Sequence, residues 1–327
     1  MVTFDSKELQ GLTFIDLFAG IGGFRLALES LGAKCVFSSE INPKSASTYE
    51  KNFGEKPFGD ITVIDEKDIP EHDILCAGFP CQAFSASGKK LGFADTRGTL
   101  FFDVARIVKA KQPKVVFMEN VQFFMAHDNG KTLNVVKTTM EDLGYQFNVD
   151  VLNAVDYGVP QFRRRTYMVC FRNDLGINSF QFPYPRPLFS SVNDILLEDN
   201  EEIDQLYFMR DDLYAPNLKT STDPKNVHLV YFFNKAGQGE RVYNPDGVCI
   251  TLSTMCHAKF LFKKGIRRLH QRECARLMGY PDSFILPKSF TESHRQLGNS
   301  VVVDVIQYIA NDIGRALDGK DAEFALF

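Results

Sequence analysis

The sequence predicts an α/β fold, with a doubly wound, mostly parallel sheet that carries helices on both faces and a second, smaller, irregular β-rich domain. From residue 13 to residue 171, apolar runs of strand length alternate with amphipathic runs of helical length, which is the pattern of βαβ units. Near residue 178, prolines and then an acidic stretch interrupt this rhythm. Short apolar runs between turn residues continue from there to about residue 271, which favours a separate β-rich part.

The elements of the first part have local signals in the sequence. Gly32 stops the first helix, Pro43 suits the first turn of the second, and Gly78 breaks the third strand. The predicted strands are Thr13–Phe18, Lys34–Ser39, Asp73–Ala77, Pro113–Met118, Phe147–Ala154 and Thr166–Phe171. The predicted helices are Phe24–Leu31, Pro43–Phe53, Leu100–Lys109, Lys131–Leu143, Arg272–Met278 and a last helix that Gly298 opens and that runs through Leu317.

The composition is that of a globular protein, with 44% hydrophobic and 24% charged residues. The net charge of −4 argues weakly against a nucleic-acid binder, although residues 162–165 and 259–268 concentrate positive charge that could meet phosphate or form a solvated surface. No apolar run is long enough to span a bilayer, and the N-terminus has no signal-peptide pattern. We therefore expect the seven cysteines to be thiols, and without a Cys-x-x-Cys pair a zinc site has little support.

A glycine-rich loop at residues 19–23 separates the first strand from the first helix. Glycines let a ligand approach the backbone, and a helix N-terminus favours polar or anionic groups, although a bare tight turn is an equal alternative. Glu40 ends the second strand about 20 residues after the loop, where a carboxylate can bind ribose hydroxyls or simply lie exposed. Asp60 could accept from an adenine amino group or cap a turn. Together these residues favour a nucleotide-like cofactor.

Cys81 follows the third strand in a Gly- and Ser-rich loop, at the sheet edge where α/β proteins bind ligands. Its position makes it a candidate nucleophile, and the alternative is a small buried hydrophobe. Glu119 ends the next strand at the same edge, either as a second reactive group or as a surface acid. In a strand, Gln161, Arg163 and Arg165 would share one face because side chains alternate.

Six motifs follow one another along the chain. They are Phe18-x-Gly20-x-Gly22-Gly23, Pro80-Cys81-Gln82, Glu119-Asn120-Val121, Gln161-x-Arg163-x-Arg165, Arg272-Glu273-x-Ala275-Arg276-Leu277-Met278-Gly279-Tyr280-Pro281 and Gly298-Asn299-Ser300-Val301. In these motifs, and over nearly its whole length, the chain resembles the DNA (cytosine-5) methyltransferases of bacterial restriction–modification systems. It is similar in particular to the HhaI-type members, especially over Ile74–Ser85 and Arg97–Phe102.

The resemblance implies a Rossmann-like catalytic domain that binds S-adenosyl-methionine (AdoMet), here residues 1–180 and 272–327, and a target-recognition domain, residues 181–271. It implies transfer of a methyl group to carbon 5 of a flipped-out cytosine in duplex DNA, which leaves S-adenosyl-homocysteine (AdoHcy). It also implies a bacterial, cytoplasmic, nucleoid-associated monomer that needs no metal. A cognate restriction endonuclease would belong to the same system without forming a stable complex.

The resemblance assigns roles to residues that match the family's motifs. Cys81 adds to carbon 6 of the cytosine, and Glu119 acts at ring nitrogen 3. Arg165 holds the cytosine carbonyl and orients Glu119, and both Arg163 and Arg165 stabilise the Cys81 thiolate. The implied cofactor-binding residues are Phe18, Gly20, Gly22, Gly23, Glu40, Ile41, Asp60, Ile61, Gly78, Pro80, Leu100, Asn299 and Val301. The implied DNA-binding residues are Ser85, Ser87, Lys89, Arg97, Gln238, Arg241, Thr251 and Ser253.

The chain departs from the HhaI-type pattern at two places. Ile41 stands where that pattern has a Trp, so packing against adenine would be aliphatic. Residues 253–264 lack the glycines of the recognition loop in that pattern. The recognition sequence is therefore not carried over from the resemblance.

Other interpretations remain open at this point. A tRNA cytosine-5 methyltransferase would share Pro80-Cys81-Gln82 and Glu119-Asn120-Val121 on the same fold, although segments 237–241 and 250–253 favour DNA. A catalytically silent DNA-binding regulator would not need all three of Cys81, Glu119 and Arg165, which are intact here. A nicotinamide dehydrogenase is disfavoured because the glycines are not spaced Gly-x-Gly-x-x-Gly.

Overall fold

The computed structural model describes residues 4, 7–80, 100–198, 201–208, 225–232, 241–255 and 258–320. The chain packs as two compact units. The larger unit comprises Val2–Leu152, Arg165–Tyr184 and Ile306–Phe327, and the smaller unit comprises Met1, Asn153–Arg164 and Pro185–Val305. The predicted division into a catalytic and a target-recognition domain concerns function rather than packing, so it stays a prediction.

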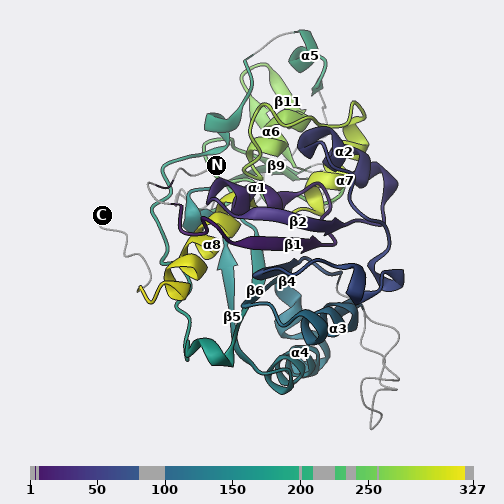
Figure 1. The fold of residues 1–327 in the computed structure, drawn as a ribbon. Coiled ribbons are helices and arrows are strands. Elements are labelled where there is room, and N and C mark those ends of the chain that lie inside the picture. The colour runs from purple at the N-terminus through teal and green to yellow at the C-terminus, as the bar shows by residue number, and fades with distance from the viewer. Residues whose placement is uncertain are drawn as a thin grey trace. The chain divides into compact units, whose positions relative to one another are not determined.

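The larger unit contains a six-stranded sheet (Figure 1). Its strands are β1 (Thr13–Leu17), β2 (Lys34–Ser39), β3 (Ile74–Ala77), β4 (Val115–Val121), β5 (Tyr145–Asn153) and β6 (Arg164–Arg172), in the order β2-β1-β3-β4-β6-β5. β1 pairs in parallel with β2 and β3, β3 pairs in parallel with β4, and β6 runs antiparallel to β4. The chain changes direction of travel across the sheet beside β1, and such a point is where open α/β sheets bind ligands. The predicted α/β fold is confirmed.

Helices cover both faces of this sheet. They are α1 (Gly23–Ser30), α2 (Pro43–Phe53), α3 (Leu100–Lys111), α4 (Lys131–Asp142) and most of α8 (Val303–Leu317). α3 and α4 lie together on one face (Figure 1), where Val104 and Val136 join a buried cluster with Ile15. On the other face, Phe24 of α1 packs edge-on against Phe117 of β4, with ring centroids 5.2 Å apart. This is the doubly wound arrangement that the alternating pattern predicted.

The second helix, α2, illustrates why several predicted boundaries agree with the structure. The Asn42 side chain accepts hydrogen bonds from the amides of Lys44 and Ser45, and Pro43 occupies the first turn. Gly54 ends the helix with a φ of 70°, in the left-handed region that favours glycine. An N-cap of this kind is worth about 1 kcal/mol, so local chemistry sets both ends of the helix.

The smaller unit contains a five-stranded sheet. Its strands are β7 (Tyr207–Phe208), β8 (Leu229–Phe232), β9 (Arg241–Tyr243), β10 (Lys259–Phe262) and β11 (Gly265–Arg268), in the order β7-β11-β10-β9-β8. β10 and β11 are antiparallel neighbours, and β10 pairs in parallel with β9. The described helices of this unit are α5 (Glu201–Asp204), α6 (Gln271–Arg276) and α7 (Phe290–Gly298). A second, small sheet is therefore present, as the change of pattern near residue 178 predicted.

The C-terminal helices differ from the prediction. Gly298 ends α7 instead of opening the last helix, and α8 begins only at Val303. The amide of Val303 is bonded to the Met278 carbonyl at 2.9 Å, and residues 301 and 302 between the two helices are not helical. The prediction missed α7 because its sequence is short and mostly polar.

The expectation that Gln161, Arg163 and Arg165 share one face of a strand is also wrong. Of the three, only Arg165 lies in β6, because the strand begins after the other two. Backbone hydrogen bonds of 2.8 Å on both sides of Gln161 join its segment to Cys249. Pairing with a distant segment has replaced extension of the strand, and nothing in the local sequence indicates such a partner.

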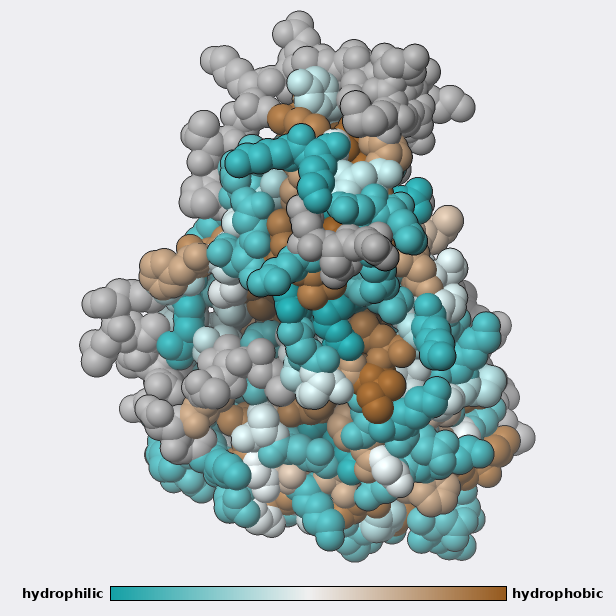
Figure 2. All heavy atoms as spheres, turned by 90° about the horizontal axis from the view of Figure 1, so that it is seen from above, coloured by the Kyte–Doolittle hydropathy of each residue, from teal (hydrophilic) through white to brown (hydrophobic). Residues whose placement is uncertain are grey.

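Apart from the residues drawn in grey, the surface seen in Figure 2 is mainly hydrophilic, with smaller hydrophobic groups between the hydrophilic side chains. The most exposed large hydrophobic residues are Phe189, Val63, Ile41 and Met255. No disulfide joins the five cysteines in the described part of the chain. Among the described helices, none combines the length and the apolar character needed to cross a membrane.

Candidate active site

Glu119 and Arg165 form an ion pair on neighbouring strands of the large sheet. The distance from Arg165 Nε to Glu119 Oε1 is 3.1 Å, and the two side chains are 15% and 13% exposed. The register of β4 and β6 places Val121 opposite Arg165, so the ion pair runs diagonally between residues on one face of the sheet. Low exposure strengthens the attraction relative to a surface pair. The structure thus brings together two of the predicted catalytic residues and fixes the orientation of the acid.

Cys81 itself lies outside the described residues, but the segment that leads to it is well fixed. Asn120, 2% exposed, donates its side-chain amide to the Phe79 carbonyl at 2.9 Å. A Cβ added at Gly78 would lie 3.9 Å from Glu119 Oε2, so this segment passes close to the acid. Strand β4 therefore carries the acid and also holds the start of the Cys81 loop. Sequence reasoning gave Asn120 no role, although its place inside a motif was a signal.

The glycine loop adopts left-handed backbone at alternate positions. The φ angles of Phe18, Gly20 and Gly22 are 57°, 57° and 87°. A Cβ added at Gly20 would meet no atom within 4 Å, so the backbone there is open to a ligand. A Cβ added at Gly22 would lie 2.3 Å from the Phe53 ring of α2. Gly22 is therefore required by packing, and Gly23 is buried as the first residue of α1.

Glu40 is held between the glycine loop and α2. One carboxylate oxygen accepts from the Gly20 amide at 2.8 Å, and the other accepts from the Asn42 amide at 2.6 Å. A carboxylate oxygen has more than one lone pair, so both oxygens can accept further hydrogen bonds. The arrangement suits a ligand that lies over the loop and presents hydroxyl groups.

The other predicted cofactor residues of the larger unit differ in burial. Asp60 accepts from the Thr62 amide at 2.9 Å and thereby caps a short 3₁₀ turn, which was one of its two predicted roles. Ile61 is buried in the core, whereas Ile41 is 69% exposed. The remaining three are the half-buried Gly78, the exposed Pro80 and the half-buried Leu100 at the start of α3.

Asp16 is a residue that sequence reasoning missed. It lies in β1, two residues before Phe18, and is completely buried without a hydrogen bond of normal geometry to either carboxylate oxygen. Burial raises the pKa of Asp16 to about 8. The charge and the backbone amide of Arg25 oppose this rise, and the charge of Glu40 adds to it. The available signal was an acid inside an otherwise apolar strand.

In the smaller unit, Arg163 binds backbone carbonyls. Its guanidinium donates to the carbonyl oxygens of Leu252 at 2.8 Å, Gly298 at 3.0 Å and Ser300 at 2.7 Å. These acceptors offset the cost of burying the charge, since the residue is only 3% exposed. Cys81 lies outside the described residues, so the action of Arg163 on Cys81 stays a prediction.

The predicted DNA-binding and remaining cofactor residues of the smaller unit lie on loops and strand ends. Arg241 begins β9, and the Thr251 hydroxyl donates to a backbone carbonyl at 2.7 Å. Ser253 and Asn299 are exposed, and Val301 is buried. The predicted residues that lie outside the described ranges are Cys81, Ser85, Ser87, Lys89, Arg97 and Gln238.

The basic stretch 259–268 is not a continuous positive surface. Lys259 and Arg267 are buried, so they neither contact phosphate nor form part of a solvated surface. Lys264 is half-exposed and pairs with Asp204 at 2.8 Å. The pattern of basic residues along the sequence therefore overstated the positive charge available to a partner.

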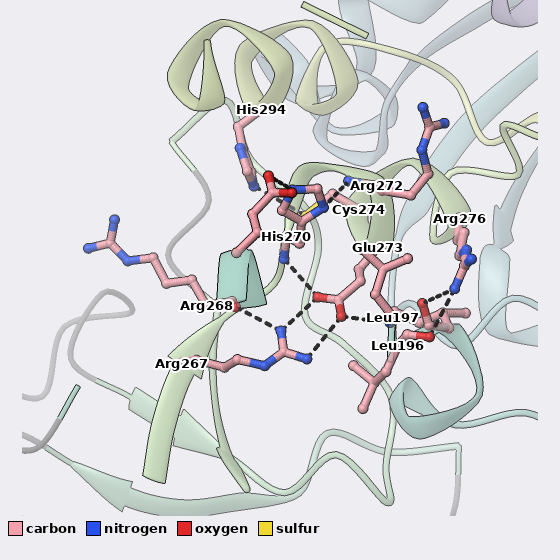
Figure 3. A network of polar contacts seen from close by, with 12 residues as sticks. Leu196, Leu197, Arg267, Arg268, His270, Arg272, Glu273, Cys274, Arg276 and His294 are labelled. Atoms are coloured by element: carbon pink, nitrogen blue, oxygen red, sulfur yellow. Dashed lines mark hydrogen bonds and ion pairs between the residues drawn. The ribbon is translucent and has the colours of Figure 1, made fainter. Parts of the chain in front are cut away.

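Arg267 instead forms a buried ion pair with Glu273 (Figure 3). The two Arg267–Glu273 hydrogen bonds are 2.7 Å and 2.9 Å long, and Glu273 also accepts from the amides of His270 and Leu197. Burial alone would lower the pKa of Arg267, but the hydrogen bonds and charge of Glu273 raise it above its ordinary value. Glu273 thus joins β11, the start of α6 and the segment before α5.

Comparisons with known proteins cover nearly the whole chain. The sequence profile of the family described as C-5 cytosine-specific DNA methylase matches residues 12–315. The Type II methyltransferase M.HhaI of Haemophilus parahaemolyticus is 57% identical over 98% of this chain and 99% of the relative. The Type II methyltransferase M.HpaII of Haemophilus parainfluenzae is 43% identical over 90% of this chain and 87% of the relative. The Dnmt2 methyltransferase of S. pombe matches in fold, with 21% identity, a TM-score of 0.70 and coverage of 94% and 99%.

The matched range includes both the strand edge of Glu119 and the segment of Asn299. The level of identity to Type II methyltransferases speaks against a tRNA methyltransferase, a silent regulator and a dehydrogenase. The chain therefore belongs to the family of C-5 cytosine-specific DNA methylases, and it is a DNA (cytosine-5) methyltransferase of the restriction–modification type.

Proposed function

We propose that this enzyme transfers the methyl group of AdoMet to carbon 5 of a flipped-out cytosine in duplex DNA, through a covalent intermediate on Cys81. The observation that carries the proposal is the ion pair of Glu119 and Arg165 on β4 and β6. β3, which leads to Cys81, pairs with β4, so the acid and the nucleophile leave neighbouring strands. Family membership supports DNA as the substrate.

The glycine loop and Glu40 fit AdoMet. Gly20 leaves open space for the methionine end, and the Glu40 carboxylate is fixed where it can accept from ribose hydroxyls. Phe18 and the exposed Ile41 would pack against adenine, whose amino group Asp60 could bind. Bound AdoMet supplies a methyl group on a positively charged sulfur. In the smaller unit, Asn299 and Val301 match further cofactor positions of the family and are proposed for the same role.

Cys81 makes carbon 5 of cytosine reactive. Carbon 5 is a poor nucleophile, but addition of the Cys81 thiolate to carbon 6 turns the ring into an enamine-like species. Carbon 5 then takes the methyl group and later loses its proton to a base. The electron pair of that carbon–hydrogen bond re-forms the double bond between carbons 5 and 6. The carbon–sulfur bond breaks and its own electron pair stays on sulfur, which restores the thiolate and leaves 5-methylcytosine. This sequence requires no metal.

Glu119 and Arg165 stabilise the ring during this addition. Thiolate addition places negative charge on the cytosine, and a protonated Glu119 can neutralise it at ring nitrogen 3. The planar, permanently charged guanidinium of Arg165 orients Glu119 and suits the cytosine carbonyl as a donor. Arg163 was predicted to support the thiolate as well, and that role stays a prediction.

Carbon 6 lies inside the stack of a duplex, so the target base must be flipped out. We propose that residues 84–97 close over the extruded base and exclude water. We propose that Ser87 and Gln238 enter the space that the flipped cytosine leaves in the duplex. Phosphate contacts would come from Lys89, Arg97 and Thr251, and Arg241 would bind a guanine edge. The remaining proposed DNA contacts are Ser85 and Ser253. We propose a monomer that protects host DNA against a cognate endonuclease acting separately.

A covalent trap tests the proposed function. In a duplex with 5-fluorocytosine at the target position, fluorine replaces the proton that must leave carbon 5, so the adduct cannot be released. With AdoMet, the wild-type enzyme should form a protein–DNA complex that survives denaturing electrophoresis, and Cys81→Ser should form none. Cys35→Ser is the matched control and should behave as wild type. An adduct in the Cys81→Ser variant would contradict the proposal.

A further inference from the structure

Arg163 connects two segments that carry different proposed roles. Residues 251–254 contain the Leu252 carbonyl, and residues 298–301 contain the carbonyls of Gly298 and Ser300. The first segment holds the proposed DNA contacts Thr251 and Ser253. The second holds the proposed cofactor contacts Asn299 and Val301. One buried guanidinium therefore binds the backbone of both segments, which lie far from each other in the sequence.

The two segments also touch directly. A Cβ added at Gly298 would lie 2.5 Å from the carbonyl carbon of Ser253, so the two backbones are in contact there. The Leu252 amide donates to Gln161 Oε1 at 3.0 Å, and Gln161 donates onward to the Leu277 carbonyl at 2.9 Å. Displacement of either segment therefore disturbs contacts of the other.

The guanidinium of Arg163 is suited to this place. Its planar fork presents several N–H donors in fixed directions, whereas a lysine ammonium is a point charge on a flexible stem. Two of the three carbonyls lie at or just after the last turn of α7, where the helix dipole is negative and favours a cation. A lysine at position 163 would keep the charge but lose the shared hydrogen bonds.

We infer that Arg163 is a positioning residue that couples the binding of DNA to the binding of AdoMet. The inference rests on the proposed function for the roles of the two segments. Because Arg163 bonds to both segments, a ligand that shifts one segment shifts the other, so binding of the first ligand changes the free energy of binding the second. The coupling must be reciprocal, because each ligand changes the affinity for the other by the same factor.

Titration calorimetry tests this inference with AdoHcy, which cannot react, and a short duplex that carries the sequence methylated in cells. The dissociation constant of AdoHcy is measured with and without the duplex, and the ratio is the coupling factor. In wild type we expect a factor of about 5–150, the usual range for coupled sites. In Arg163→Lys it should fall below about 2, in keeping with a lost coupling.

Arg276→Lys is the matched control. Arg276 also donates to backbone carbonyls, those of Ile195 and Leu196 (Figure 3). Its other hydrogen-bond partner among the described residues is Asp282, which belongs to neither of the two segments. Loss of Arg276 should lower stability without changing the coupling factor. Gly298→Ala, which leaves the guanidinium intact and separates the two backbones, should lower the factor as Arg163→Lys does.

Two results would overturn the inference. One is a coupling factor near 1 in the wild-type protein. The other is a factor in Arg163→Lys that equals those of wild type and Arg276→Lys. Failure of the proposed function gives a different result, because neither AdoHcy nor the duplex would then bind the wild-type protein.

Discussion

Glu119 depends on its ion-pair partner for orientation, so its replacement tests the chemistry of a single residue. Glu119→Gln keeps the size of the side chain but cannot give up a proton in the same way. We expect methyl transfer to fall by about 10²- to 10⁴-fold, the usual worth of general acid–base help. AdoHcy binding should be unchanged. Glu141→Gln, on the outer surface of α4, is the control, and a loss of less than about tenfold in Glu119→Gln would refute the assigned role.

Asp16 gives the stability of the protein an unusual dependence on pH. Its pKa is about 8 in the folded chain against an ordinary 3.8, so the folded state keeps a proton that the unfolded chain releases between these values. The proton held on Asp16 therefore adds to the free energy of unfolding at low pH. This addition falls by about 1.4 kcal/mol per pH unit as the pH rises toward 8. Relative to wild type, Asp16→Asn should therefore gain free energy of unfolding from pH 5 to pH 8 in urea titrations.

Asp73→Asn is the control, because folding shifts the pKa of Asp73 in the opposite direction to that of Asp16. Burial tends to raise the pKa of Asp73, but hydrogen bonds from Thr13 and Lys114 lower it below its ordinary value. Its ionised form therefore stabilises the fold throughout pH 5 to 8, and Asp73→Asn should cost stability by an amount that stays constant over this range. A pH-independent difference between wild type and Asp16→Asn would contradict the burial of a protonated Asp16.

Individual site residues could be predicted from the sequence where a motif fixes their chemistry. Glu40 directly follows β2 and Glu119 lies near the end of β4, as the strand patterns predicted, because local pattern sets the ends of these buried parallel strands. Arg163 and Asp16 were not understood in advance. The acceptors of Arg163 lie on segments distant in sequence, which leave no trace in the local pattern. The signal for Asp16, an acid inside an apolar strand, was present and was overlooked.

The start of α6 depends on one buried acid. Glu273→Gln would leave Arg267 buried without a counter-charge, and breaking such a pair costs about 3–5 kcal/mol. Asp282→Asn is the matched control, since Asp282 pairs with Arg276 but is 59% exposed. Its loss should cost less than about 1 kcal/mol. Equal losses in the two variants, measured by urea unfolding, would show that burial does not decide the strength of this pair.

Elements were predictable where caps and periodicity agree. α2 has an N-cap, a proline and a C-terminal glycine, and its predicted bounds match the structure. α7 lacks an apolar run, and its buried polar residues Ser293, His294 and Gln296 concealed the face that packs inward. The break between α7 and α8 was missed because tertiary contacts around Val303, and not a helix breaker, separate the two helices.

At the scale of the whole molecule, the α/β class and a second sheet followed from the rhythm of the sequence. The division into packed units did not follow from it, because Asn153–Arg164, which lies between two strands of the large sheet in the sequence, belongs to the same packed unit as Pro185–Val305. The net charge of −4 was a poor guide to a DNA substrate. Several basic residues, among them Arg163 and Arg267, bind groups inside the protein, so total charge does not describe the surface.

Cys81 is proposed to drive methylation of cytosine in DNA at one short sequence. Bisulfite sequencing of genomic and plasmid DNA from cells that express the wild-type chain, with Cys81→Ser alongside, tests this role. We predict cytosines protected at one motif in the wild type and at none in the variant. Unprotected DNA from cells with folded wild-type protein, or the same protection in the Cys81→Ser variant, would contradict the claim.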